Sequence, residues 1–258
     1  MDGERIARSP AGEDSASIVV PFLKWPGGKR WLAADHRGIF PTKFKRYVEP
    51  FLGSASVFFA LKPERALLSD ANEELITTYR AIRWRPKAVI DALNRHAARH
   101  CDTYYYEARS TQPGGLIERA ARLIYLNRTC FNGIYRVNLD GVFNVPRGTK
   151  NTVVLPTDDF QALGRMLRGA QLENKDFEEI IDQAGEGDFV FADPPYTVRH
   201  NTNGFIKYNE KLFSWSDQER LAAALARARR RGARIVATNA NHASIRELYA
   251  SHRFAQRT

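Results

Sequence analysis

The stretch Asp188-Phe189-Val190-Phe191-Ala192-Asp193-Pro194-Pro195-Tyr196 decides the fold of this chain. The apolar run from Phe189 to Ala192 is too short for a helix, and its Phe and Val content predicts a strand buried on both faces. The two prolines cannot extend a sheet ladder, so the strand must end there and the chain must turn. Asp193 and Tyr196 are therefore expected at the carboxyl end of a strand. In open α/β sheets this edge is where ligands bind.

Length and composition limit the class of protein. The chain has 258 residues, 43% of them apolar, enough for one large domain or a domain with a sizeable insertion. No stretch approaches the roughly 18 apolar residues of a membrane span. Residues 1–18 lack the apolar core of a secretion signal and are expected to form a disordered leader. Cys101 and Cys130 show no metal-ligand spacing, so we expect no metal site and a reducing, cytoplasmic setting.

Positive charge is concentrated in the middle of the chain. The formal charge is +10, and residues 80–169 contain fifteen Lys and Arg against seven Asp and Glu. A basic segment of this size suggests a polyanion such as nucleic acid as a partner. An Arg-rich solvated surface explains the same composition equally well, so charge alone leaves both interpretations open.

Two further predicted strands end in an acidic residue, and a glycine-rich turn precedes them. Arg46 to Glu49 reads as a strand followed by a turn at Gly53 and a helix, without the three-glycine fingerprint that binds a pyrophosphate. A second strand ends in Asp70, which could accept the hydroxyls of a ribose or cap the helix that follows. The Pro-Gly-Gly turn within Lys24 to Lys29 could hold a zwitterionic ligand, or it could be only a turn.

The rest of the chain continues to alternate strands and helices. Gln171 to Glu173 and Arg234 to Asn239 read as strands, and Ser216 with Glu219 as the capping box of a helix. Thr197 to Phe213 reads as a mobile loop over the strand ends. This alternation predicts an α/β fold with a largely parallel sheet, formed by residues 19–79 and 170–258. Residues 80–169 interrupt the pattern and are expected to form a second domain.

An ordered set of motifs resembles one enzyme family. The motifs are Lys24-Trp25-Pro26-Gly27-Gly28-Lys29, Glu49-Pro50-Phe51-Leu52-Gly53-Ser54, Asp70, Leu126-Asn127-Arg128, Phe143-Asn144-Val145-Pro146 and Asp193-Pro194-Pro195-Tyr196. Together they resemble the Dam-type (D12 class) DNA adenine-N6 methyltransferases from roughly Pro21 to His242. The resemblance implies a Rossmann-like methyltransferase sheet with an inserted, mostly helical DNA-recognition domain at 80–169 and a β-hairpin.

The resemblance also implies a cofactor and a reaction. The cofactor is S-adenosylmethionine, and its pocket would comprise Trp25, Pro26, Gly27, Lys29, Phe51, Gly53, Asp70, Asp176, Phe177 and Asp193. Asp176 is the least specific of these, because an Asp-Phe pair also fits a surface acid beside a core aromatic. The catalytic motif would be Asp193, Pro194, Pro195 and Tyr196. Asp193 and the Pro194 carbonyl would each accept a hydrogen bond from the adenine amino group. Tyr196 would stack on the flipped base.

The resemblance implies double-stranded DNA as the partner. The chain is expected to recognise the sequence GATC and to act as a monomer. The DNA contacts would come from Lys24, Arg128, Phe131, Asn132, Ile134, Arg136 and Pro146. Phe131 would intercalate, Asn132 would face the orphaned base, and Arg136 would reach a guanine edge. Arg128 is expected to contact a phosphate.

The C-terminus departs from the family pattern. Family members continue into a C-terminal β-hairpin that completes the sheet, whereas this sequence stops at Thr258. An unpaired sheet edge would lower stability. Two hypotheses therefore stand: an active adenine methyltransferase, or an inactive methyltransferase-like DNA-binding module. Methylation of RNA is a third, which the duplex-reading hairpin disfavours.

Overall fold

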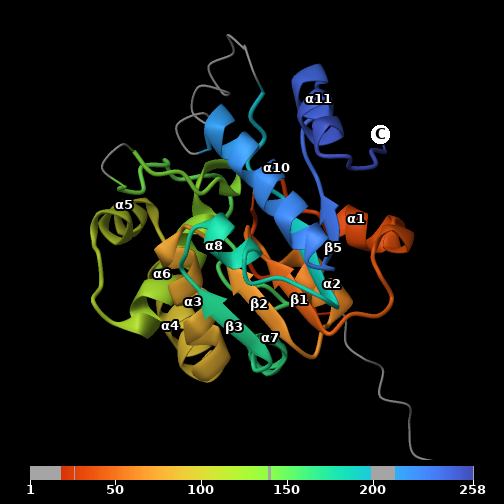
Figure 1. Cartoon of the computed structure of the whole chain (residues 1–258). Coiled ribbons are helices and arrows are strands. Elements are labelled where there is room, and N and C mark those ends of the chain that lie inside the picture. The colour runs from red at the N-terminus through yellow and green to blue at the C-terminus, as the bar shows by residue number, and fades with distance from the viewer. Residues whose placement is uncertain (1–18, 26, 139–140, 199–212, 258) are drawn as a thin grey trace, which may run out of the picture.

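The structure is a computed structural model that describes residues 19–25, 27–138, 141–198 and 213–257 (Figure 1). The predicted leader, Pro26 and most of the predicted loop from Thr197 to Phe213 lie outside the described residues. Among the described residues, no helix combines the length and apolar character needed to cross a membrane.

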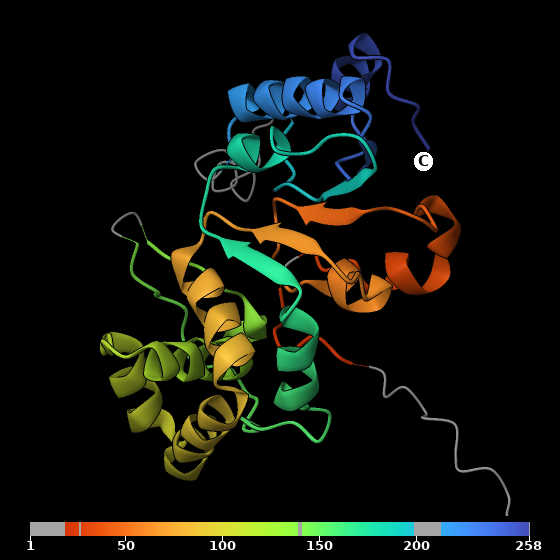
Figure 2. The same ribbon diagram turned by 60° about the horizontal axis from the view of Figure 1, so that its bottom comes forward.

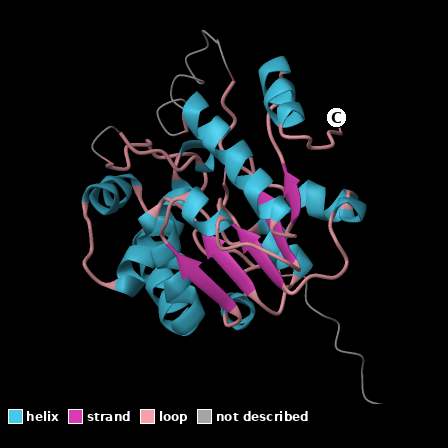
Figure 3. Cartoon of the chain, in the orientation of Figure 1, coloured by secondary structure: helices cyan, strands magenta, loops and turns pink. Residues whose placement is uncertain are grey.

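A five-stranded sheet forms the centre of the molecule, and each strand runs parallel to its neighbours (Figure 3). The strand order is β3-β2-β1-β4-β5. Every residue of β4 is buried, as the run of Phe and Val predicted. The parallel sheet confirms the predicted α/β fold. The strands are β1 (Arg46–Glu49), β2 (Ala66–Ser69), β3 (Ala170–Glu173), β4 (Asp188–Ala192) and β5 (Arg234–Ala237).

Helices cover both faces of the sheet, as Figure 2 shows. Successive strand residues point to opposite faces, so Tyr47 and Phe189 enter one buried cluster while Val48 and Val190 enter the other. The first face packs against α1 (Arg30–Asp35), α2 (Ser56–Leu61), α3 (Glu73–Trp84) and α7 (Phe160–Leu167), with a short 3-10 helix, η1, at Arg37–Ile39. The second face packs against α8 (Phe177–Ile181), α10 (Trp215–Arg230) and α11 (Ala243–Ser251).

Residues 80–169 add a helical layer beside α3 and a long antiparallel loop. Leu93 and Ile124 from this layer belong to the same buried cluster as Tyr47 of the sheet, so the helices extend one core. The antiparallel bridges Cys130–Arg147 and Val137–Phe143 join the two arms of the loop. The helices are α4 (Pro86–Arg99), α5 (Asp102–Ser110) and α6 (Leu116–Thr129), and the 3-10 turn η2 (Phe131–Gly133) opens the loop.

The capping box of α10 lies two residues before the predicted one. The Ser214 hydroxyl accepts from the Asp217 amide at 3.2 Å, and the Asp217 carboxylate accepts from the Ser214 amide at 2.8 Å. Two overlapping Ser-x-x-acid patterns occur here, and the buried side chain of Phe213 places Ser214 at the helix boundary. The predicted pair, Ser216 and Glu219, lies inside the helix instead.

Candidate active site and DNA-facing loop

Three carboxylates lie at the carboxyl edge of the sheet. Glu49 ends β1, Asp70 follows β2, and Asp193 follows β4. The strand order reverses between β1 and β4, and such a switch point opens the crevice in which α/β proteins bind ligands. Glu49 is 3% exposed, and its Oε2 has no hydrogen-bond partner among the described residues. Sequence reasoning did not include Glu49 in the site, although its place at a strand end was the same signal that selected Asp70.

The field of this edge favours a positively charged ligand. Burial raises the pKa of Glu49 well above its usual range, the neighbouring Tyr47 hydroxyl opposes this shift, and the charges of Asp193 and Asp70 add to it. Burial also raises the pKa of Asp70, while hydrogen bonds from the Asn72 and Gly53 amides oppose that shift. A cation bound beside buried carboxyl groups favours their charged form and is itself stabilised by them. Their arrangement therefore suits a sulfonium or ammonium group.

The turn after β1 is held by Asp70. The Gly53 amide donates to Asp70 at 3.0 Å, and the Tyr79 hydroxyl donates to the Gly53 carbonyl at 2.9 Å. Gly53 has φ +47°, and a Cβ there would lie 2.8 Å from the Trp25 ring. Glycine thus permits both the turn and the close approach of the indole. Asn72 caps α3 by accepting from the amide three residues on, so the alternative role of Asp70 as the helix cap is wrong.

The Asp-Pro-Pro-Tyr motif is joined to the glycine-rich turn near the N-terminus. The Lys29 ammonium lies 2.7 Å from Asp193 Oδ2 and 5.1 Å from the centre of the Tyr196 ring. The Lys29 residue is only 7% exposed, and its ammonium also donates to the carbonyl of Gly27. The Thr238 hydroxyl donates to Asp193 Oδ1. Both oxygens of the predicted catalytic carboxylate are therefore held in place, and each oxygen keeps a further lone pair.

Residues from α10 and the end of β5 brace the same motif. The buried Gln218 side chain donates to the Pro195 carbonyl at 3.3 Å and accepts from Asn239 at 2.9 Å. The Thr238 amide donates to the carbonyl of Ala192 at 3.0 Å, which ties β5 to β4 at the point where the motif begins. Sequence reasoning missed these supports. Thr238 and Asn239 did end a predicted strand, and Gln218 shares the apolar spacing of its helix.

An aromatic cluster lies beside the crevice. The ring of Phe51 stacks on Phe177 with centroids 5.4 Å apart, and Phe213 meets Phe51 edge-on at 5.6 Å. Asp176 caps α8 by accepting from the Glu178 amide and pairs with Arg220 at 2.8 Å. These are the contacts of a surface acid beside a core aromatic, the alternative that the sequence left open for Asp176.

The antiparallel loop presents the predicted DNA-contacting residues at the surface. Phe131 is 53% exposed although it is an aromatic residue, and its amide donates to the Pro146 carbonyl across the loop. Ile134 is also exposed, as are Asn132, Pro146 and Arg136. Asn132 adopts φ +54°, a left-handed conformation that turns the chain where this loop begins. Exposed aromatic and aliphatic side chains beside a turn are residue types that some DNA-binding proteins insert between base steps.

Lys24 connects this loop to the crevice. Its backbone amide and carbonyl both bond to the buried Asn127 side chain, at 2.9 and 2.7 Å. Asn127 also donates to the Gly133 carbonyl at 3.1 Å, so the two segments are held together. The Lys24 side chain is exposed, and contact with Lys150 lowers its pKa, with a further contribution from burial. The adjacent ammonium groups of Lys24 and Lys150 favour an electron-rich ligand. The sequence did not single out Lys150.

The predicted phosphate contact of Arg128 does not fit this structure, because the guanidinium is buried and already paired inside the fold. The residue is 3% exposed and forms a two-pronged ion pair with Asp158 at 2.6 and 2.7 Å. Its guanidinium also donates to the carbonyls of Val153 at 2.8 Å and Phe22 at 2.9 Å. The side chain therefore joins α6 to Phe22, which precedes β1, and to Val153 and Asp158, which precede α7. Its role is structural.

Carboxyl groups at the switch point of a parallel sheet, together with an exposed loop that carries Arg136, are features expected of an α/β enzyme that acts on nucleic acid. The family model of the D12 class N6 adenine-specific DNA methyltransferases matches residues 25–258, and the chain belongs to this family. The family membership confirms the predicted family and enzyme class and agrees with the α/β sheet.

Three relatives show how far the similarity extends. The type II methyltransferase M1.LlaDCHI of Lactococcus lactis subsp. cremoris is 36% identical over 238 residues, or 89% of this chain and 84% of the relative. The DNA N-6-adenine-methyltransferase of Escherichia phage P1 is 34% identical over 93% of this chain and 32% of its own. The DNA adenine methylase of Haemophilus influenzae is 32% identical over 91% of this chain and 84% of the relative.

Proposed function

We propose that this chain transfers a methyl group from S-adenosylmethionine to the exocyclic amine of adenine in double-stranded DNA, within the sequence GATC. The observation that carries the proposal is the contact of Lys29, Asp193 and Tyr196 at the carboxyl edge of the sheet. This group lies beside the turn held by Gly53 and Asp70 and is connected through Lys24 to the exposed loop.

The crevice fits the proposed cofactor. S-adenosylmethionine supplies a methyl group activated by a positively charged sulfur, and it carries an ammonium and a ribose. The strand-end carboxyl groups offer acceptors to the ammonium, and among the described residues the Oε2 of Glu49 is a buried acceptor with no hydrogen-bond partner. Asp70 keeps lone pairs for the ribose hydroxyls. The pocket would be lined by Trp25, Pro26, Gly27, Lys29, Phe51, Gly53 and Phe177.

Asp193 and Pro194 supply the acceptors that the adenine amine needs. The lone pair of this nitrogen is delocalised into the ring, which makes it a poor nucleophile. Acceptors on both hydrogens localise the pair, and here these are the Asp193 carboxylate and the Pro194 carbonyl. Lys29 and Thr238 fix the direction of the carboxylate, while Gln218 holds the next carbonyl of the motif. Tyr196 is 37% exposed, so its ring is accessible to a flipped base.

Residues 80–169 are proposed to recognise the target sequence through the antiparallel loop. Phe131 would enter the base stack, Asn132 would face the orphaned base, and Ile134 and Pro146 would pack nearby. Arg136 would pair with a guanine edge. Replacing Arg136 by Ala is expected to reduce discrimination by about 1–3 kcal/mol at one guanine. Transfer rates on GATC and on duplexes with a changed first base measure this, and an unchanged preference would contradict the assignment.

Transfer of a tritiated methyl group tests the whole proposal. GATC duplexes should acquire label, and a GTTC control should not. Asp193→Ala should abolish transfer while DNA affinity and the circular dichroism spectrum stay nearly unchanged, because the acceptor of the amine hydrogen is lost. Wild-type protein that binds both donor and DNA but labels neither duplex would support the inactive DNA-binding module instead.

A further inference from the structure

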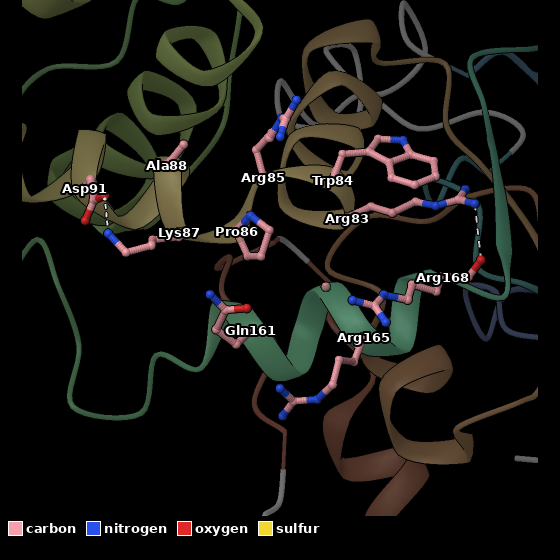
Figure 4. Close-up of a pocket in the computed structure, with 11 residues that line it drawn as sticks. Arg83, Trp84, Arg85, Pro86, Lys87, Ala88, Asp91, Gln161, Arg165 and Arg168 are labelled. Carbon is pink, nitrogen blue, oxygen red and sulfur yellow. Dashed lines mark hydrogen bonds and ion pairs between the residues drawn. The ribbon is translucent and has the colours of Figure 1, made fainter.

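A basic groove lies away from the proposed active site, where α3 meets α4 and α7 packs beneath them (Figure 4). Its volume is about 480 Å³. Arg83, Arg85 and Lys87 come from the α3–α4 corner, and Arg165 and Arg168 come from α7 and its C-terminal end. Trp84 lies at the groove with 64% of its surface exposed.

The charges in the groove are not balanced by the residues that line it. Asp91 is the one acid among them, and it pairs with Lys87 at 3.3 Å. Arg83 donates to the carbonyls of Ala170 and Arg168. Over the described part of the chain, the side chains of Arg85, Arg165 and Arg168 form no hydrogen bond or ion pair.

The walls of the groove are held at a fixed spacing. Gly164 is buried where α7 crosses the α3–α4 corner, and a Cβ there would lie 2.8 Å from the Ile82 carbonyl and 3.3 Å from Pro86. The Arg83 guanidinium lies 4.5 Å from the Trp84 ring, which fixes one side of the groove. The free arginines therefore project from helices whose relative position is set by close packing.

The groove is remote from the carboxyl edge of the sheet. Helix α3 begins three residues after Asp70 and ends at Trp84, so its 12 residues span roughly 18 Å between the crevice and the groove. Arg168 lies just before the first residue of β3, at the amino edge of the sheet. In Figure 1, α7 lies at the bottom of the view, whereas the antiparallel loop lies at the upper left. Phosphates next to the target adenine are therefore distant from these arginines.

We propose that this groove binds the phosphate backbone of a DNA segment other than the one that holds the target adenine. Guanidinium groups pair with phosphate through two parallel hydrogen bonds, and three of them are free here. A chain of a DNA methyltransferase family meets this polyanion as its substrate. A second contact would keep the enzyme on DNA between target sites. The proposal depends on a DNA substrate, but not on the GATC assignment.

Binding of a duplex made only of G·C pairs tests the groove, because such DNA contains no adenine. The test variant is Arg85→Gln/Arg165→Gln/Arg168→Gln. The matched control, Lys43→Gln/Arg230→Gln/Arg257→Gln, removes the same charge from exposed positions outside the groove. Loss of three phosphate contacts should reduce the slope of log affinity against log salt by about 2.7. Between about 50 and about 200 mM salt, wild-type affinity should then fall about forty-fold more than that of the variant.

Two further measurements make the result decisive. Methyl transfer to a short duplex with one target site should be unchanged in the groove variant, which shows that the fold and active site are intact. If wild-type protein transfers no methyl group, the proposed function fails, yet the G·C duplex experiment still decides the groove. Equal salt slopes for the groove and control variants would overturn the proposal. Displacement of the G·C duplex by poly-L-glutamate as effectively as by DNA would also overturn it, because the groove would then be a site for acidic proteins.

Discussion

Thr238 is predicted to position the Asp193 carboxylate that we propose to be catalytic, and Thr238→Val tests this role with little change in side-chain shape. The Thr238 hydroxyl donates to Asp193 Oδ1, while Lys29 holds Oδ2. Valine removes the donor and leaves the carboxylate held from one side, so its plane can rotate away from the adenine amine. The strand should survive, since Thr238 is only half-buried and its backbone bond to Ala192 is kept.

The expected effect follows from the strength of one hydrogen bond to a charged group, about 1.5–3 kcal/mol. If that energy is lost in the transition state, the single-turnover rate of methyl transfer should fall by about 10- to 150-fold. The affinities for donor and DNA should change little, because the hydroxyl faces the carboxylate and not a ligand. Rapid-quench measurement with both substrates saturating isolates this step.

Thr238→Ser is the matched control, since it keeps the hydroxyl and loses only a methyl group. Its rate should stay within a few-fold of wild type. A wild-type rate in Thr238→Val would refute the positioning role. An equal loss of rate in both variants would show that packing at this position, and not the hydrogen bond, matters.

Three other predictions concern stability and pH. Arg128→Met should lower the free energy of unfolding by about 3–5 kcal/mol in urea titrations, because Asp158 is left buried and charged without its partner; wild-type stability would contradict the structural role. The double variant Arg128→Met/Asp158→Leu should recover part of the loss. Burial raises the pKa of Glu49, so the folded protein keeps a proton that the unfolded chain releases above its ordinary value of 4.5. The free energy of unfolding should therefore fall as pH rises above that value. Glu49→Gln should make this fall smaller, as measured by urea titrations at several pH values. The same pH dependence in wild type and variant would count against the pKa shift.

The strand ends of the active site were predictable because local chemistry specifies them. A run of Phe and Val followed by two prolines can only be a buried strand that stops, which placed Asp193 and Tyr196 correctly at the carboxyl edge. The same logic placed Gly53 in the turn after one strand and Asp70 at the end of the neighbouring strand. The order of motifs along the chain then identified the family, which the match over residues 25–258 confirmed.

Side chains whose role depends on a distant partner were harder to predict. Arg128 was expected to face DNA, but it follows Ala121 and Ile124 at helical spacing and so lies on the buried side of α6. That spacing was visible in the sequence, whereas its partner Asp158 lies 30 residues away. Asp176 likewise acquired its ion pair from Arg220 on another helix.

The sequence by itself determined the fold class, the family and the residues at the strand ends, because strand burial, proline and glycine act within a few residues. Only the tertiary structure decided what surrounds the Asp193 carboxylate: Lys29 from the N-terminal turn and Thr238 from the end of β5, which pack together across the sheet edge. It also decided that Glu49 is a buried carboxyl with a raised pKa, and that free arginines from α7 and the α3–α4 corner share one groove. Burial and charge depend on segments far apart in the chain, and only packing brings those segments together.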